Sequence, residues 1–343
     1  MVYSASSVWS LYKFDISYYY LRRQAVFAVL GLVSMFFCAS FNYWNWRRLV
    51  QPVFWINFIL LILVFIPGIG IERSEAQRWI NLGFVQFQPT DVTKFAMVLF
   101  TANYLVVKKE YMHTFKRGLL PVLIVAGITA GLIMLQPDLG TTLTILMTVF
   151  ILLFGGGARI LHLCGVALAG VPIIAVPILF IPHFRYQLAR LTTFLNPWAD
   201  PIGSGWQIIQ SLLAIGSGGL GGVGLGASRQ KFLYLPEPWS DFIYAIICEE
   251  LGFIGGAAVL ILFLILIWRG YRIAISAQDL FGKYMAMGLT SLIAVQVCIN
   301  LGVVLGTLPV TGITLPLLSY GGTSLLMTLS FIGILLNISR YSS

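Results

Sequence analysis

The chain alternates between long apolar runs and short polar connections. Nine runs are long enough to cross a bilayer as helices, and they cover residues 24–41, 49–67, 89–107, 118–136, 139–158, 163–181, 241–268, 285–305 and 322–338. Residues 1–9 have the character of the end of one further span. The pattern predicts an all-α polytopic integral membrane protein with nine complete transmembrane helices plus the stub of a first, organised as a single domain over residues 1–343.

Composition supports a membrane location and excludes several function classes. The chain is 59% hydrophobic and only 10% charged, which excludes an ordinary soluble domain. Its four cysteines lie in apolar stretches without CxxC spacing, so neither a disulfide framework nor a zinc site is indicated. The three histidines are scattered and predict no metal site. No soluble basic domain or binding motif points to nucleic acid.

The distribution of basic residues predicts how the spans are oriented. If the connection after residue 41 is cytoplasmic, the short loops carry eleven Lys and Arg on that side and six on the other. By the positive-inside rule this orientation is favoured, and the basic face suits the anionic lipids of the cytoplasmic leaflet. The long connection 182–240 is then extracytoplasmic. We therefore expect a multi-pass membrane protein whose unusual motifs face outside.

Two connections are rich in glycine. Loop 182–240 is predicted to contain a helix around residues 205–215, followed by the run GSGGLGGVGLG, which matches GxGxxG at Gly216, Gly218 and Gly221. A nucleotide site is rejected because no βαβ unit surrounds the run and no GK[ST] follows. Instead, the glycines predict tight turns and close backbone packing. The later segment GTLPVTGITLPLLSYGGTS predicts a re-entrant stretch that is packed within protein.

Three carboxylates mark the span that begins near residue 241. Asp241 lies at its mouth, where the Pro-rich LPEPWSD runs into an apolar helix, and Glu249 and Glu250 lie inside it. Intramembrane carboxylates are costly and are functional candidates by default. For Asp241 an N-terminal helix cap and a catalytic role are equally good accounts. Glu249 and Glu250 are expected to anchor neighbouring helices through hydrogen bonds.

Further charges lie close to the same predicted outer surface. Arg73, Arg78, Asp91 and Lys94 follow the second complete span. Lys94 is expected either to extend to the surface or to pair with Asp91 three residues earlier. Asp138, in the turn QPDLGTT, is expected to cap the helix that follows it.

Several motifs together resemble the SEDS (shape, elongation, division and sporulation) family. They are MVYSAS, AQRWINLG with QPTDVTK, QPDLGTT, FLNPWADPIGSGWQIIQS, GGLGGVGLGASRQKFLYLPEPWSDFIYAIICEELGFIGG and GTLPVTGITLPLLSYGGTS. These motifs are most similar to those of the division and sporulation branch of the family. The resemblance implies ten spans with both ends cytoplasmic, so most of the first span is missing from this sequence. One departure is Asp91, which stands where the family usually has glutamate.

The resemblance implies an inverting glycosyltransferase that polymerises lipid II into glycan strands at the outer face of the bacterial cytoplasmic membrane. Pyrophosphate needs no protonation as a leaving group, so one base and a cationic clamp suffice. Asp241 is the expected base. The expected clamp is Arg78, Lys94, Arg190, Arg73, Arg229 and Lys231, and the expected supporting residues are Asp91, Asp138, Glu249 and Glu250. A divalent cation could share the duty, although no dedicated ligand set is evident.

The resemblance also implies a partner, a class B penicillin-binding protein that cross-links the new strand. Two other functions fit the sequence. One is a lipid II flippase or transporter, since intramembrane charges and interrupted spans suit transporters. Two observations argue against a transporter: no inverted repeat is evident in the sequence, and the polar motifs lie on one face of the membrane. The other is a non-catalytic scaffold that recruits the transpeptidase. Division, elongation and sporulation roles are not distinguished by the sequence.

Overall fold

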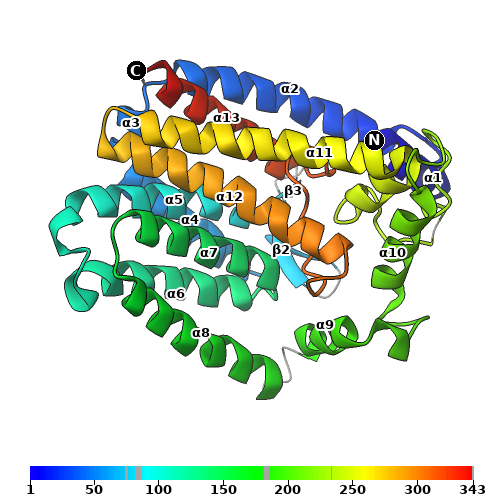
Figure 1. The fold of residues 1–343 in the computed structure, drawn as a ribbon, viewed down its shortest axis with the longest axis horizontal. Helices are drawn as coiled ribbons and strands as arrows, with labels where there is room; N and C mark the ends of the chain where they lie inside the picture. The colour runs from blue at the N-terminus through cyan, green and yellow to red at the C-terminus, as the bar shows by residue number, and fades with distance from the viewer. Residues whose placement is uncertain (74–75, 82–85, 181–184, 233, 342–343) are drawn as a thin grey trace. The chain divides into compact units, whose positions relative to one another are not determined.

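The computed structural model describes residues 1–73, 76–81, 86–180, 185–232 and 234–341. Helices dominate this part of the chain (Figure 1). The α-helices are α1 Val2–Phe14, α2 Tyr19–Ser40, α3 Trp44–Arg48, α4 Val50–Leu63, α5 Pro89–Val107, α6 Leu120–Met134, α7 Leu139–Gly155, α8 Ile160–Phe180, α9 Arg185–Leu195, α10 Trp206–Gly218, α11 Ile243–Ser276, α12 Leu280–Val304 and α13 Gly322–Arg340. Short 3-10 helices η1 (Lys109–Tyr111) and η4 (Pro197–Ala199) and a π-helix η2 (Phe115–Leu119) complete the set.

The predicted apolar runs all coincide with helices in the described ranges. They correspond in order to α2, α4, α5, α6, α7, α8, α11, α12 and α13. Five helical stretches there are both long and apolar enough to cross a membrane: Tyr19–Ser40, Phe115–Met134, Ile243–Ser276, Leu280–Val304 and Gly322–Arg340. The helix expected around 205–215 is α10. Loop 182–240 also contains α9, which was not predicted from the sequence.

The chain forms two compact units, each assembled from segments far apart in the sequence. Unit 1 comprises Met1–Val33, Arg185–Leu266 and Gln296–Leu329; unit 2 comprises Ser34–Phe184, Ile267–Val295 and Ser330–Ser343. Helices α2, α11, α12 and α13 contribute residues to both units.

Unit 2 is built around α5, which packs against α4, α6 and α7 (Figure 1). Pro89 stands in the first turn of α5, where a missing N–H costs nothing. Met97, Leu99 and Leu105 on this helix are fully buried. Because α5 is covered on so many sides, its short polar side chains are buried as well, and among them Thr93 donates to Asn57 Oδ1 at 2.6 Å.

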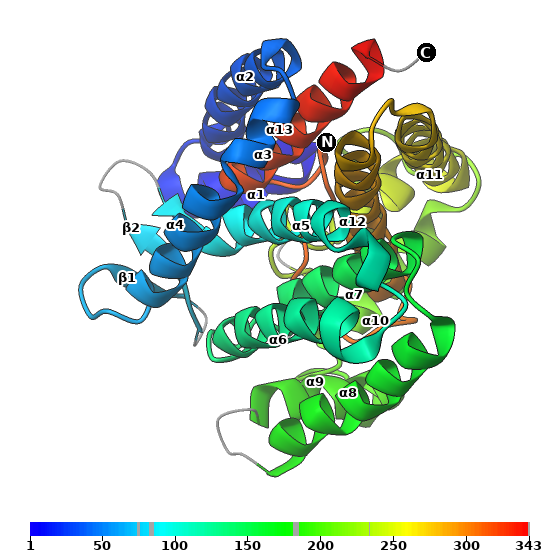
Figure 2. The same cartoon turned by 90° about the vertical axis from the view of Figure 1, so that its left-hand side faces the viewer.

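A small antiparallel sheet follows α4 and was missed by the sequence analysis. Strands β1 (Gly70–Arg73), β2 (Ala76–Asn81) and β3 (Gln86–Phe87) lie in the order β1-β2-β3, and Figure 2 shows β1 and β2 as a hairpin. In the register, Ile71 opposes Trp79 and Ile80 opposes Phe87. The hairpin contains a bulge beside Ile71, which interrupts the alternation of apolar and polar positions that would reveal a strand.

In unit 1, helix α11 is interrupted at Gly252, whose backbone (φ 67°, ψ −167°) is not helical. The glycine-rich run 219–224 lies against this break and pairs with it through four backbone hydrogen bonds. These are Val223 N–H to Glu249 O (3.0 Å), Gly224 N–H to Glu250 O (3.1 Å), Phe253 N–H to Gly219 O (2.9 Å) and Ile254 N–H to Leu220 O (3.2 Å). We call this pairing the glycine clasp.

The glycine clasp needs residues without side chains because the two backbones nearly touch. A Cβ on Gly222 would lie 2.2 Å from the carbonyl oxygen of Glu250, and a Cβ on Gly252 would lie 2.3 Å from the nitrogen of Gly222. Both glycines also have positive φ, which other residues rarely adopt. The GxGxxG-like run therefore serves close backbone packing, as the sequence analysis expected, and supplies partners to a broken helix.

Candidate active site

Asp241 follows a segment that cannot be helical. Pro236 and Pro238 lack the N–H that a helix interior requires, Glu237 has a positive φ of 44°, and α11 begins only at Ile243. Trp239 anchors this approach: it is 4% exposed, and its ring lies 5.8 Å from that of Trp9 and 4.7 Å from that of Tyr20. The start of α11 is therefore set by buried aromatic packing on one side of Asp241.

The backbone of residues 239–241 is held by α12 and by the loop between α12 and α13. Three successive carbonyl oxygens each accept a hydrogen bond from this side. The donors are Tyr320 N–H to Trp239 O (2.8 Å), Ser319 Oγ to Ser240 O (2.6 Å) and Asn300 Nδ2 to Asp241 O (2.8 Å). The loop itself is buried in unit 1, with Thr311, Leu315 and Ser319 each at most 4% exposed. This burial agrees with the expected packing within protein.

The side chain of Asp241 is half-buried. Its Oδ1 accepts a hydrogen bond from Ser240 Oγ at 2.9 Å. Its Oδ2 faces Gly312, where a Cβ would lie 3.5 Å from that oxygen. Gly312 has a φ of +74°, so the loop passes the carboxylate as bare backbone. A partly exposed carboxylate is suited to accept a proton from a hydroxyl group.

Arg190 reaches the same loop from α9. Its Nη1 donates to Val310 O at 2.9 Å, two residues from the glycine that borders Asp241. The guanidinium is only partly buried. It has five N–H donors in a fork that matches phosphate oxygens. Arg190 is thus the predicted clamp residue that unit 1 places against the loop bordering the carboxylate.

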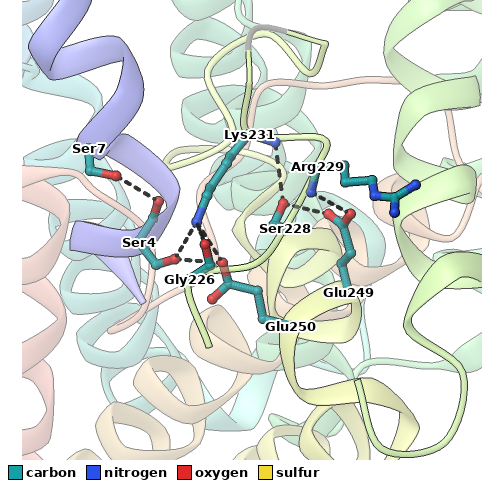
Figure 3. Close-up of polar contacts among 8 residues, drawn as sticks. All are labelled: Ser4, Ser7, Gly226, Ser228, Arg229, Lys231, Glu249 and Glu250. Carbon is teal, nitrogen blue, oxygen red and sulfur yellow. Dashed lines mark hydrogen bonds and ion pairs between the residues drawn. The ribbon is translucent and has the colours of Figure 1, made fainter. Parts of the chain in front are cut away.

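Lys231 is also predicted for the clamp, but its ammonium group makes its contacts within the protein (Figure 3). Its ammonium lies 3.2 Å from Glu250 Oε1 and 3.3 Å from Ser4 Oγ, and it also donates to Gly226 O. The lysine and glutamate side chains are only 4% and 0% exposed. An ammonium has three donors, and all three are used here. In this geometry Lys231 pairs with Glu250, and we leave it out of the proposed clamp.

Glu249 and Glu250 anchor a loop and α1. Glu249 accepts hydrogen bonds from Ser228 Oγ at 2.5 Å and from Arg229 N–H at 2.8 Å, whereas Ser4 Oγ donates to Glu250 at 2.6 Å. The anchoring role expected for both carboxylates agrees with these contacts, although their partners lie mostly in the connection before α11. The Arg229 side chain is exposed and extends away from Glu249 (Figure 3), so it stays a candidate for the clamp.

Unit 2 holds the remaining candidates. Lys94 Nζ pairs with Asp91 Oδ1 at 3.0 Å, and both side chains are nearly buried, so the expected pairing three residues apart is present. Asp138 caps α7 by accepting from Thr141 N–H at 3.1 Å, also as expected. Arg78 donates through Nε to Gln136 O at 3.0 Å and through Nη2 to Pro137 O.

After these contacts, the cationic side chains of unit 2 differ in the number of hydrogen-bond donors that they have left. Among the described residues, the acceptor recorded for Lys94 is Asp91 alone, so this largely buried ammonium keeps donors for a further partner. Arg78 retains one side of its guanidinium. Arg73 ends β1, and its side chain lies outside the described residues. No group of three or more His, Cys, Asp or Glu in the described ranges could hold a metal ion.

The loop between α9 and α10 is tightened by Asp200. Its carboxylate accepts hydrogen bonds from the backbone N–H groups of Gly203 (3.0 Å) and Ser204 (2.8 Å). These bonds favour the ionised form and lower the pKa of Asp200 below its ordinary value.

Sequence reasoning missed Asn300 and Ser319. Both are buried and both hold the backbone at Asp241. A signal was present, because an asparagine in the middle of an apolar span is costly in lipid and is retained only with partners.

Comparison with known proteins places this geometry in context. Residues 1–343 match the family described as cell cycle protein, FtsW/RodA/SpoVE. Stage V sporulation protein E of Bacillus subtilis (strain 168) is 51% identical over 342 residues, which cover 100% of this chain and 93% of that protein. The probable peptidoglycan glycosyltransferase FtsW of Trichlorobacter lovleyi is 43% identical over 339 residues, covering 99% of this chain and 88% of the relative.

Solved structures are similar over the same length. A chain from a peptidoglycan synthase complex, described for the structural coordination of polymerization and crosslinking, matches with a TM-score of 0.80 at 32% identity. That match covers 98% of this chain and 94% of the other. The rod shape determining protein RodA of Thermus thermophilus matches with a TM-score of 0.67 at 28% identity, covering 98% and 93%.

Proposed function

This chain belongs to the FtsW/RodA/SpoVE family of cell cycle proteins, and from that premise we propose that it is a peptidoglycan glycosyltransferase acting on lipid II. It is a multi-pass membrane protein, and we place its active site on the outer face of the cytoplasmic membrane. The observation that carries the proposal is Asp241, a half-buried carboxylate at the mouth of α11 that lies beside Gly312 of the loop between α12 and α13. The relatives named as peptidoglycan glycosyltransferases support the reaction type.

In the proposed reaction Asp241 acts as general base. Its carboxylate takes the proton from the 4-hydroxyl of the acceptor sugar as that oxygen attacks the anomeric carbon of the donor. The bond from the anomeric carbon to the polyprenyl pyrophosphate breaks, the pyrophosphate leaves with the electron pair, and the configuration inverts. The leaving group is already a stable anion, so no second carboxylate is needed as an acid.

The developing charge on pyrophosphate calls for cations. Within unit 1, which holds Asp241, we assign this duty to Arg190 and Arg229, while Arg78 and Lys94 of unit 2 stay candidates on the strength of the family motifs alone. Bidentate guanidinium groups suit phosphate oxygens. Among the described residues no group of three or more His, Cys, Asp or Glu could hold a divalent cation.

The 51% identity to a stage V sporulation protein favours a role in sporulation over one in division. A transpeptidase partner, a class B penicillin-binding protein, is supported by the similarity to a chain from a complex that couples polymerization to crosslinking.

The direct test uses purified protein, alone and with its transpeptidase partner, supplied with lipid II. We expect the wild-type protein to form glycan polymer and Asp241→Asn to form at least a hundredfold less, since general base catalysis contributes about 10²–10⁴. Asp15→Asn, the same change at an exposed carboxylate in unit 1, is the matched control. Full activity of Asp241→Asn would refute the assignment of the base, and absence of polymer with the partner present would refute the enzyme.

The same protein in vesicles tests the transporter alternative. Lipid II scrambling that persists in Asp241→Asn, with no polymer from the wild type, would favour transport.

A further inference from the structure

Asn300 joins Asp241 to the loop that passes its carboxylate. The residue lies on α12 and is 1% exposed. Its side-chain nitrogen donates to the carbonyl oxygen of Asp241 at 2.8 Å and to that of Ile313 at 2.7 Å. Both hydrogens of one amide group therefore bridge two backbone segments that are far apart in the sequence.

The orientation of this amide is fixed by its partners. Two carbonyl oxygens can only accept, so the atom between them must be the NH2 group; a flipped amide would set oxygen against oxygen. The remaining atom, Asn300 Oδ1, is buried and has no hydrogen-bond partner among the described residues. An unpaired buried acceptor is costly. The side chain thus gives up one hydrogen bond while making the bridge.

The bridge sets the position of the carboxylate relative to Gly312. Gly312 directly precedes Ile313 and borders Asp241 Oδ2. The Asn300 amide group thereby holds the backbone from which the Asp241 side chain extends. It also holds the segment that contains Gly312. Because productive proton transfer needs the reacting atoms held within a few tenths of an ångström, loosening this bridge is costly for catalysis even though Asn300 touches no substrate.

We propose that Asn300 is a positioning residue that holds Asp241 against the Gly312 segment in the geometry needed for base catalysis. The proposal rests on the proposed function of Asp241. Removing the bridge leaves the Asp241 carboxylate and the groups that bind the substrate in place. We therefore expect kcat to fall while KM changes little.

The test compares three variants in the polymerisation assay with lipid II. Asn300→Ala is expected to lower kcat about 10- to 100-fold with KM changed less than about threefold. Asn300→Asp keeps the shape, but a carboxyl group at this 1% exposed position is favoured in its neutral form and offers one donor to the two carbonyl groups in place of two. Its kcat should therefore also fall, with KM changed less than about threefold.

Asn337→Ala is the matched control. Asn337 is also 1% exposed and also bridges two backbone groups, accepting from Tyr43 N–H at 2.9 Å and donating to Ala39 O at 2.7 Å. Its removal takes away as many hydrogen bonds in unit 2, whereas Asp241 belongs to unit 1. The kcat of its monodisperse fraction should remain within about threefold of wild type.

The outcomes separate the two proposals. If Asp241→Asn is inactive while Asn300→Ala and Asn300→Asp both match Asn337→Ala in kcat, the positioning role is refuted and the proposed function stands. If Asp241→Asn keeps its activity, the base assignment fails first. If Asn300→Ala does not fold, Asn300→Asp decides alone: a kcat within about threefold of wild type, or a loss that appears in KM instead of kcat, overturns the proposal.

Discussion

Replacing Lys231 by methionine should destabilise unit 1 far more than an ordinary lysine substitution. Methionine fills similar space but has no charge and no donor. In the native structure the ammonium serves Glu250, Ser4 and Gly226, and the Lys231 and Glu250 side chains are 4% and 0% exposed. Lys231→Met would leave Glu250 buried without its counter-charge, beside a second buried carboxylate at Glu249.

The expected loss follows from this burial. Removing one partner of a buried ion pair costs about 3–5 kcal/mol, because the remaining charge stays desolvated and unpaired. For a chain of this size that corresponds to a drop in Tm on the order of 10 °C. The double variant Lys231→Met/Glu250→Gln removes both charges and should recover part of the loss, with a coupling energy of about 1–3 kcal/mol.

Thermal unfolding in detergent, followed by near-ultraviolet circular dichroism, measures the effect. Lys116→Met, at an exposed lysine in η2, is the control and should change Tm little. The reasoning would be refuted if Lys231→Met were as mild as Lys116→Met, or if the double variant were less stable than Lys231→Met alone.

Two further predictions concern the loops of unit 1. Gly222→Ala should destabilise the protein by about 2–4 kcal/mol, since its Cβ would lie 2.2 Å from Glu250 O at a positive φ, whereas Gly221→Ala, with nothing within 4 Å, should be nearly neutral in the same melting experiment. Acidification should loosen the turn at Asp200: its pKa is lowered in the folded state, so its contribution is present above the ordinary value of 3.8 and is lost as the pH falls through the folded value. Hydrogen exchange of the turn amides, corrected for the intrinsic pH dependence, should rise on acidification in the wild type; an unchanged protection would contradict this account.

Hydropathy located the helices well but not all of their ends. The predicted span 89–107 is α5 to the residue. In contrast, the span predicted to end at residue 268 continues as helix to Ser276. Arg269 and Arg272 stopped the apolar run, but charged residues end the lipid-compatible stretch and do not end the helix. The interruption of α11 at Gly252 was not predicted, because a single glycine does not lower the hydropathy of an apolar run even where it breaks the helix.

In the candidate site, local relations were predictable and distant ones were not. The Asp91–Lys94 pair and the Asp138 cap involve residues three positions apart, and both were expected from spacing. The partner of Glu250 was not, because Lys231 lies 19 residues away and Ser4 lies 246 away. This is why Lys231 was assigned to the clamp. The family, by contrast, was identified from its motifs, and the comparisons confirm it.

The glycine clasp bears on how this protein reaches its membrane. Helix α11 entering lipid by itself would expose the backbone groups freed at its break, each at a cost of several kcal/mol. The hydrogen-bond partners of these backbone groups lie in residues 219–224. These residues are synthesised before α11 and are therefore available when the helix emerges. The stretch and the helix should therefore be integrated as one unit during biogenesis, and a chimaera that exchanges α11 without its own glycine stretch should be cleared by membrane proteases instead of accumulating.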